Sequence, residues 1–183
     1  MAGCTACNST RSTLLFTMKG FDLVKCDDCD LAYVLNQPDE AYLSSLYSAD
    51  NGNYHTQLFD PDSKDARRMA RIAEVHLNFL GRVADAGRLV DVGCSTGSFL
   101  KLADRAGFAA SGVEFSQSSA TVAARRTGLD IETGGIHDCR LAEGSVDIVT
   151  MFDVIEHVPD PARDLARAYE LLRPGGWLVL STP

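Results

Sequence analysis

Four of the six cysteines occur as two pairs, each with two residues between its members. Cys4 and Cys7 form the first pair, and Cys26 and Cys29 form the second. Thiolates at this spacing reach one ion from a tight turn, and two such turns complete the tetrahedron that Zn²⁺ prefers. Four thiolates leave no open position for a substrate, so the pattern predicts a structural zinc site. Two local disulfides or four free thiols are the alternatives that the sequence leaves open.

A second set of chemical groups surrounds a glycine turn at residues 93–97. Asp91 lies in the apolar run before the turn, and Gly93 and Gly97 open and close it. Glycines let the backbone approach a ligand closely, and a strand, a glycine turn and a helix in succession are typical of nucleotide binding in doubly wound folds. Glu114 ends the next apolar segment, where a carboxylate can accept hydrogen bonds from both ribose hydroxyls of a nucleoside. The sequence therefore predicts a nucleotide-type site at this turn.

A third cluster follows another apolar run and consists of Asp153, Glu156 and His157. If a helix begins at Asp153, these positions face the same side and their side chains converge. Three interpretations remain open: a divalent-metal site, a role for His157 as an acceptor-side base or orienting group, and a structural role alone. His157 is the candidate catalytic residue.

Alternating strands and helices are expected to position these groups. Apolar strands are predicted at residues 88–92, 109–114, 130–132, 146–152 and 177–181. Helices are predicted between them at residues 98–105, 117–127 and 161–173. Ser116 and Asp160 are the expected N-caps. An earlier amphipathic helix carries His76 on its apolar stripe, where a core histidine is the simplest interpretation. The alternation predicts an α/β fold with a doubly wound, mostly parallel sheet.

Three regions are expected along the chain. Residues 1–35 are predicted to form a zinc ribbon with a β-hairpin between the cysteine pairs, and metal binding would supply most of its folding free energy. Residues 36–86 are predicted as a tyrosine-rich linker, with a short helix at 43–47, followed by the amphipathic helix at 67–83. The linker either packs the ribbon onto the main domain or closes over its site. Residues 87–183 are predicted to form the nucleotide-binding domain.

Composition and charge exclude several classes of partner. Hydrophobic residues make up 45% and charged residues 23%, which is typical of a soluble globular protein. The net charge of −8 argues against a nucleic-acid partner, because phosphate binding needs clustered Lys and Arg. No apolar run approaches the roughly 18 residues of a membrane span, and the first residues lack a signal-peptide pattern. A cytoplasmic location without a membrane partner is therefore expected. In that reducing compartment, cysteines bind metal ions more often than they form disulfides.

Four segments together resemble class I, Rossmann-like S-adenosylmethionine-dependent methyltransferases. The segments occur in the family's order and are residues 90–97, 113–114, 152–158 and 172–176. Ser95 replaces the glycine that many members have at that position, with another small residue. The resemblance implies S-adenosylmethionine as the cofactor and methyl transfer by in-line displacement.

The same resemblance implies which residues bind the cofactor. Asp91 and the glycine turn would hold the methionine part, and Glu114 would hold the ribose. Residues 152–153 would border the donor pocket. Two further contacts are expected from the loops at the strand ends and not from the resemblance. Phe115 either lies against the adenine or packs under the following helix. Either Asp138, which is otherwise a polar residue of a surface loop, or the backbone near Ile136 is placed to meet the adenine amino group. The predicted cofactor-binding residues are Asp91, Gly93, Cys94, Ser95, Gly97, Glu114, Phe115, Ile136, Phe152 and Asp153.

Two further resemblances concern the acceptor and a second metal. Cysteine pairs ahead of a methyltransferase domain resemble those of sugar C-methyltransferases, which implies a small-molecule or sugar-type acceptor. The cluster at 153–157 is similar to one in ubiquinone-pathway and small-RNA O-methyltransferases. In those enzymes the cluster resembles a divalent-metal site, where a metal would lower the pKa of the acceptor hydroxyl.

The end of the sequence adds one more expectation. The family fold usually continues with further helices and two more strands, whereas this sequence stops directly after the fifth predicted strand. Either the sequence is a fragment, or self-association or a partner chain covers the exposed strand edge. A zinc-ribbon interaction module with a non-catalytic methyltransferase-like domain is the main alternative function. The glycine spacing disfavours a nicotinamide-dependent oxidoreductase.

Overall fold

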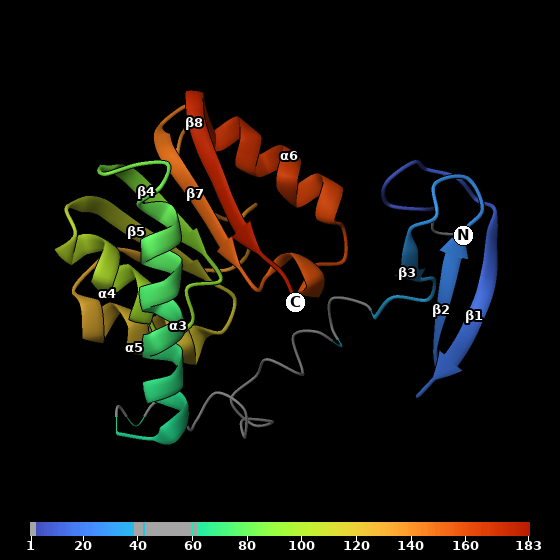
Figure 1. Ribbon diagram of the computed structural model, residues 1–183, viewed down its shortest axis with the longest axis horizontal. Coiled ribbons are helices and arrows are strands. Elements are labelled where there is room, and N and C mark those ends of the chain that lie inside the picture. The colour runs from blue at the N-terminus through green and yellow to red at the C-terminus, as the bar shows by residue number, and fades with distance from the viewer. Residues whose placement is uncertain (1–2, 39–41, 43–59, 61) are drawn as a thin grey trace.

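The computed structural model describes residues 3–38, 42, 60 and 62–183 (Figure 1). The short helix predicted at residues 43–47 lies outside these described residues. Within them, no helix is both long and apolar enough to cross a membrane.

The N-terminal residues form a small antiparallel sheet, which we call the ribbon (residues 3–34). Its strands are β1 (Ser12–Met18), β2 (Phe21–Cys26) and β3 (Ala32–Val34), paired in the order β1-β2-β3. Lys19 and Gly20 make the hairpin turn with positive φ angles of 50° and 84°, as a two-residue hairpin loop requires. Its buried apolar cluster consists of Cys4, Val24, Cys26 and Tyr33. So few buried residues leave the ribbon dependent on another source of stability.

Residues 62–183, which we call the α/β region, are built on a five-stranded sheet in which every pair is parallel. The strands are β4 (Gly87–Val92), β5 (Phe108–Glu114), β6 (Ile131–Thr133), β7 (Val146–Phe152) and β8 (Leu172–Ser181). Their order is β6-β5-β4-β7-β8, so the chain winds outward in both directions from β4. The predicted doubly wound parallel fold is confirmed, and ligands bind at the carboxyl ends of strands where such a sheet reverses direction.

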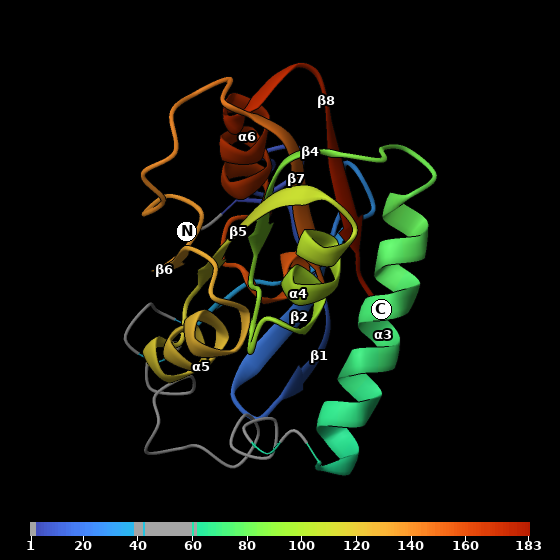
Figure 2. The ribbon, with the colours of Figure 1, turned by 90° about the vertical axis from the view of Figure 1, so that its left-hand side faces the viewer.

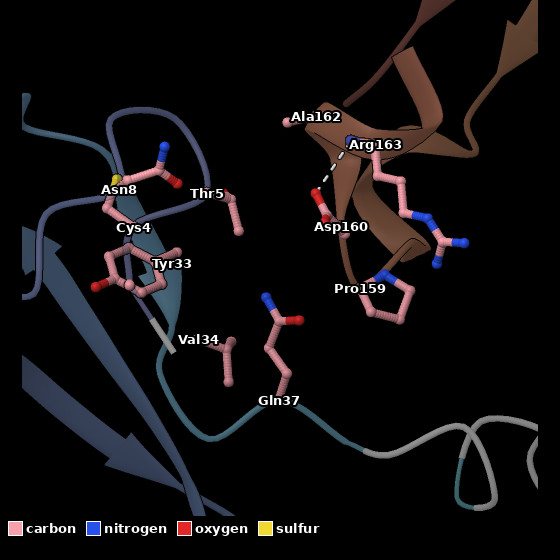
Figure 3. A pocket seen from close by; sticks show the side chains of 11 residues that line it. Cys4, Thr5, Asn8, Tyr33, Val34, Gln37, Pro159, Asp160, Ala162 and Arg163 are labelled. Atoms are coloured by element: carbon pink, nitrogen blue, oxygen red, sulfur yellow. Dashed lines mark hydrogen bonds between the residues drawn. The ribbon is translucent and has the colours of Figure 1, made fainter. Parts of the chain in front are cut away.

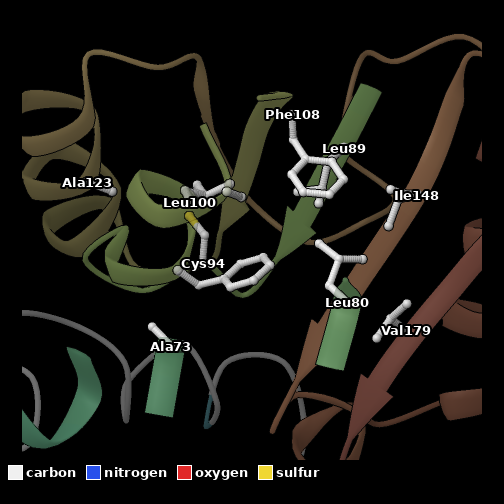
Figure 4. Packing of buried hydrophobic residues seen from close by; sticks show 11 residues of the cluster. Ala73, Leu80, Leu89, Cys94, Leu100, Phe108, Ala123, Ile148 and Val179 are labelled. Carbon is white, nitrogen blue, oxygen red and sulfur yellow. The ribbon is translucent and has the colours of Figure 1, made fainter. Parts of the chain in front are cut away.

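Helices cover both faces of this sheet (Figures 1 and 2). One face packs against α3 (Lys64–Leu80), α4 (Ser98–Arg105) and α5 (Gln117–Thr127), and the other against α6 (Pro161–Leu171). Because side chains alternate along a strand, Leu89 enters the first core and Val90 the second. Figure 4 shows the first core, where Leu80, Leu100 and Ile148 come from α3, α4 and β7.

Capping residues set the starts of the helices. Ser116 accepts a hydrogen bond from Ser119 N, and Asp160 accepts one from Arg163 N, so both predicted N-caps are confirmed. The amphipathic helix predicted at 67–83 instead spans 64–80, because Ser63 caps it and Gly81 follows its end. The last helix was predicted to reach residue 173 but ends at Leu171, since the next residue is already extended and begins β8.

Candidate functional site

The turn after β4 is held by its neighbours in space. The backbone N–H groups of Gly93 and Cys94 both donate to the Val113 carbonyl, at 2.8 and 3.2 Å. Gly93 and Gly97 have φ angles of 75° and 80°. A Cβ at Gly93 would lie 2.4 Å from Val154 Cγ2, and one at Gly97 would lie 2.7 Å from a methyl group of Thr127. Both glycines are therefore needed for packing within the protein itself.

The Cys94 side chain faces the interior. It is buried in the first core, and a Cβ added at Gly112 would lie 2.7 Å from its Sγ. Burial raises the pKa of the Cys94 thiol. Cys94 was predicted to bind the cofactor, and only its backbone is available to a ligand.

Asp91 is a buried carboxyl at the end of β4. Its partner across the sheet is Thr150 of β7, whose hydroxyl donates to Asp91 Oδ1 at 2.6 Å. Burial raises the pKa of Asp91 to about 7, the charge of Glu114 adds to this increase, and the hydrogen bond from Thr150 opposes it. Asp91 therefore exchanges its proton near neutral pH, and a cation beside it would favour the ionised form.

Glu114 connects the glycine turn to the loop after β5. Its Oε2 accepts a hydrogen bond from Ser95 N and its Oε1 from Ser116 N, each at 2.8 Å. The side chain is buried, with 8% of its surface exposed. An ionised carboxylate has about four lone-pair positions, so two backbone donors fix its orientation and leave acceptor capacity for a diol.

The residues predicted around the adenine occupy different environments. Phe115 has 43% of its surface exposed, beside Glu114. The Ile136 side chain is buried in the second core, so only its backbone is available to a ligand. Its loop is fastened by Asp138, which accepts a hydrogen bond from Gly135 N at 2.8 Å, and by His137, whose Nε2 lies 3.0 Å from Asp164 Oδ1 of α6.

Phe152 ends β7 and Asp153 follows it, beside Val154, which lies against the glycine turn at Gly93. Asp153 adopts a left-handed φ of 55°, its N–H donates to the Ser181 carbonyl, and its Oδ1 accepts a hydrogen bond from the Ser181 hydroxyl. The half-buried Phe152 ring stacks on His76 of α3, with ring centroids 3.9 Å apart and an angle of 12°. The helical pattern predicted a core position for His76, but nothing in the sequence indicated this contact.

Asp153, Glu156 and His157 do not form the metal cluster that a helix would have produced. Residues Ile155–His157 form the short 3₁₀ helix η2, and Asp153 lies outside it in its left-handed conformation. All three side chains are exposed. Among the described residues, only Cys4, Cys7, Cys26 and Cys29 bring three or more potential ligand atoms within 4.8 Å of one another. The prediction of an α-helix starting at Asp153 was wrong, and the hypothesis of a metal site here depended on that helix.

The four ribbon cysteines lie close enough together to ligate one metal ion. Their Sγ atoms lie within 4.8 Å of one another, with 3.5 Å between Cys4 and Cys29 and between Cys7 and Cys26. Zn–S bonds of about 2.3 Å imply S···S separations of roughly 3.8 Å in a tetrahedron. None of the four forms a disulfide, which does not fit the alternative of local disulfides. Desolvation opposes ionisation of Cys4, but hydrogen bonds from the Ala6 and Cys7 backbone lower its pKa to about 7.

A groove lies between the ribbon and the start of α6 (Figure 3). Polar side chains of Thr5, Asn8 and Gln37 line it from the ribbon side, and Asp160 and Arg163 line it from α6. The Asp160 carboxylate is already engaged in capping α6.

The doubly wound sheet, with two buried carboxyls and a glycine turn at the carboxyl ends of its central strands, defines a nucleotide-binding α/β protein. A family profile described as a methyltransferase domain matches residues 50–183. The chain therefore belongs to the methyltransferase-domain family, a SAM-dependent methyltransferase is among its solved structural neighbours, and the predicted family is confirmed.

Individual relatives agree with this assignment. A ubiquinone biosynthesis O-methyltransferase from Nitrosococcus oceani is 38% identical over 101 residues, covering 52% of this chain and 43% of the relative. The protein of the same name from Methylococcus capsulatus is 32% identical over 139 residues, covering 72% of this chain and 58% of the relative. A solved structure from Thermotoga maritima, a SAM-dependent methyltransferase described as a possible histamine N-methyltransferase, has a TM-score of 0.53 at 30% identity, covering 61% of this chain and 52% of that one. The chain spans about half the length of these proteins.

Proposed function

We propose that this chain is the cofactor-binding part of an S-adenosylmethionine-dependent methyltransferase that acts on a small-molecule acceptor. The observation that carries the proposal is the Glu114 carboxylate, which two backbone N–H groups hold at the carboxyl end of β5, beside the glycine turn. This position suits a ribose diol. The buried Asp91 at the end of β4 supplies a second carboxyl that a cationic ligand would ionise.

The residues present fit the cofactor, and each has a role in the proposal. Glu114 would bind the ribose hydroxyls, Asp91 and the turn at 93–97 the methionine part, and the exposed Phe115 the adenine face. The Ile136 backbone would meet the adenine edge. The donor pocket would be bordered by residues 152–153, whose carboxylate and aromatic ring suit a cationic centre.

When bound, S-adenosylmethionine supplies an electrophilic methyl group. The contribution of the chain is then to fix the geometry of approach, because holding two reactants in line removes much of the barrier. The buried carboxyl of Asp91 and the fixed carboxylate of Asp153 would orient positive charge without reorganising. His157 would face the acceptor as a base or an orienting group from the exposed helix η2.

For the acceptor, we propose a small molecule that is methylated on oxygen. Support comes from the names of two relatives, both ubiquinone biosynthesis O-methyltransferases. The sugar-type acceptor expected from the cysteine pairs has no support among the relatives described above. Replacement of His157 by Ala should lower turnover of the acceptor while leaving cofactor affinity unchanged.

The proposal includes one structural zinc ion, held by Cys4, Cys7, Cys26 and Cys29. Their S···S separations and free thiols support this role. Thiolates remain free for a metal in a reducing compartment, so we place the protein in the cytoplasm.

A second candidate function is an interaction module, and one observation favours it. Apolar side chains are exposed along β1 of the ribbon, with 58% of Leu14, 52% of Phe16 and 61% of Met18 accessible. Exposed apolar groups gathered in one place often mark contact sites. The edge strand β8, with Trp177 and Leu180 exposed, is a further place where a partner or a second copy would pair.

Calorimetric titration separates these possibilities. The zinc-loaded chain should bind S-adenosylhomocysteine in the micromolar range and should not bind NAD at the same concentrations. A folded chain that binds neither would favour the interaction module, and NAD binding would contradict the proposed function.

A further inference from the structure

Three rings from separate elements interlock at the end of β7. His76 of α3 stacks on Phe152 at 3.9 Å and 12°. Phe99 of α4 meets Phe152 edge-on, at 4.9 Å and 79°. The centroids of His76 and Phe99 lie 6.5 Å apart, also edge to face. Phe152 therefore has its orientation fixed from two helices on the same face of the sheet.

The position of Phe152 makes this contact relevant to the cofactor site. Phe152 lies two residues beyond Thr150, the residue that donates its hydroxyl proton to Asp91. The next residue, Asp153, is held in its left-handed conformation by two hydrogen bonds to Ser181. A shift of the Phe152 ring would therefore disturb both the strand end and the fixed carboxylate beside it.

Residues other than His76 also attach α3 to the sheet. The buried contacts of the helix are made by Ala73 and Leu80, both in the first core. His76 is only half-buried and lies one turn from each of them. The distinctive contact of His76 is the stack on Phe152, rather than packing that any apolar side chain would supply.

We propose that His76 is a positioning residue of the cofactor site, and that its imidazole holds the Phe152 ring against the donor pocket. The proposal rests on the proposed function, because it assigns a further residue to the same site. It extends that site to α3, a helix that precedes the four segments that resemble methyltransferases.

The electrostatic surroundings agree with this role. Burial lowers the pKa of His76, and the charge of Asp153 only partly opposes that decrease. The ring is therefore neutral at neutral pH. A neutral imidazole fits beside a cationic centre, where a protonated one would repel it.

Three variants test the proposal by calorimetric titration with S-adenosylhomocysteine. His76→Ala removes the stack, His76→Phe keeps it without a titratable group, and Val75→Ala changes a neighbour that is 66% exposed. Stacked aromatic pairs contribute enough to expect about a 5-fold loss of affinity for His76→Ala. His76→Phe should bind within about 2-fold of the wild type, and Val75→Ala should bind like the wild type.

Rescue by Phe distinguishes positioning from general packing. Thermal unfolding without ligand should show all variants folded, and His76→Leu replaces the Ala variant if that one fails to fold. Wild-type affinity in His76→Ala, or a Phe variant as weak as the Ala variant, would overturn the proposal while leaving the proposed function intact. A wild-type chain that does not bind S-adenosylhomocysteine would overturn both.

Discussion

The ribbon and the α/β region reach a defined structure by different means. The ribbon buries an apolar cluster of only four residues, two of them cysteines, and gathers four sulfur atoms around one point. The α/β region has two apolar cores, one on each face of a parallel sheet. Metal coordination supplies folding free energy directly, whereas burial supplies it in proportion to apolar area. The comparison predicts that the two regions respond independently to metal and to cofactor.

Removal of the proposed zinc ion should have the largest effect, and only on the ribbon. Structural zinc contributes roughly 10–16 kcal/mol in small metal-dependent units, far more than four buried side chains can supply. After chelation, the amides of β1 and β2 should exchange with solvent within seconds while those of β4 and β7 stay protected. Acidification should also expose the amides of β1 and β2 to exchange, because the cysteine thiols must be deprotonated to bind the metal. Affinity for S-adenosylhomocysteine should change less than about 3-fold.

A matched substitution gives a control for that result. Cys26→Ser should reproduce the effect of chelation, whereas Cys139→Ser, at a cysteine buried outside the ribbon, should leave zinc content unchanged. Loss of the β4 and β7 protection together with the ribbon would show that the two regions fold as one unit.

The next largest effect should come from Glu114, on the cofactor site and not on the ribbon. Replacement by Ala removes two charge-assisted acceptors from the ribose, and hydrogen bonds to charged groups contribute about 1.5–3 kcal/mol each. We expect S-adenosylhomocysteine affinity to fall about 100-fold. Glu143→Ala, at an exposed loop position, is the control. Zinc content should be the same in both variants, and equal affinity in both would remove Glu114 from the site.

Asp91 should give the cofactor site a pH dependence that the ribbon lacks. With a pKa of about 7 it is half protonated at neutral pH, so affinity for the ligand ammonium should fall about 10-fold between pH 8 and pH 6. Asp91→Asn should bind more weakly at pH 8 and show no such slope. A slope that persists in the Asn variant would assign the titration to another group.

The stability of the ligand-free protein should change with pH in the opposite direction to affinity. The folded-state pKa of Asp91 is raised above its ordinary 3.8, so the folded state binds more protons than the unfolded state between these values. This contribution to the free energy of unfolding is greatest below about pH 4 and is lost as the pH rises to about 7. Thermal unfolding of the wild type and Asp91→Asn across this range measures it.

The smallest effect concerns the turn itself. Gly97→Ala should destabilise the α/β region by roughly 1–3 kcal/mol, because it combines a φ of 80° with a contact of 2.7 Å to Thr127. Gly144 also has a positive φ, 61°, but a Cβ added there would meet no atom within 4 Å. Gly144→Ala therefore measures the cost of the backbone conformation alone. The difference between the two thermal midpoints measures the contact between the turn and α5. Equal midpoints would show that the contact relaxes freely.

The parts of the molecule that could be predicted from sequence are those that depend on neighbours in the chain. Two residues between paired cysteines restrict where both sulfur atoms can point, and the four ribbon cysteines do gather. The N-caps Ser116 and Asp160 accept from backbone groups three residues away. The order of apolar segments predicted the parallel sheet because crossover connections allow few arrangements.

The parts that escaped prediction depend on residues far apart in the sequence. Asp153 was expected to begin a helix, but its hydrogen bonds to Ser181 of β8 hold it in another conformation. Thr150 meets Asp91 across 59 positions, and the partner of His76 lies on a different element. In the register of β4 and β7, Thr150 is paired with Asp91. Thr150 could have been identified from the sequence only if this register had been known.

Hydrogen exchange with and without S-adenosylhomocysteine, on the zinc-loaded chain, tests the central claim most directly. We expect slower exchange on binding at residues 91–97, 112–116 and 150–154, where the carboxyl ends of β4, β5 and β7 meet, and unchanged exchange at residues 4–34. Protection confined to the ribbon, or binding that leaves all three strand ends unchanged, would contradict it.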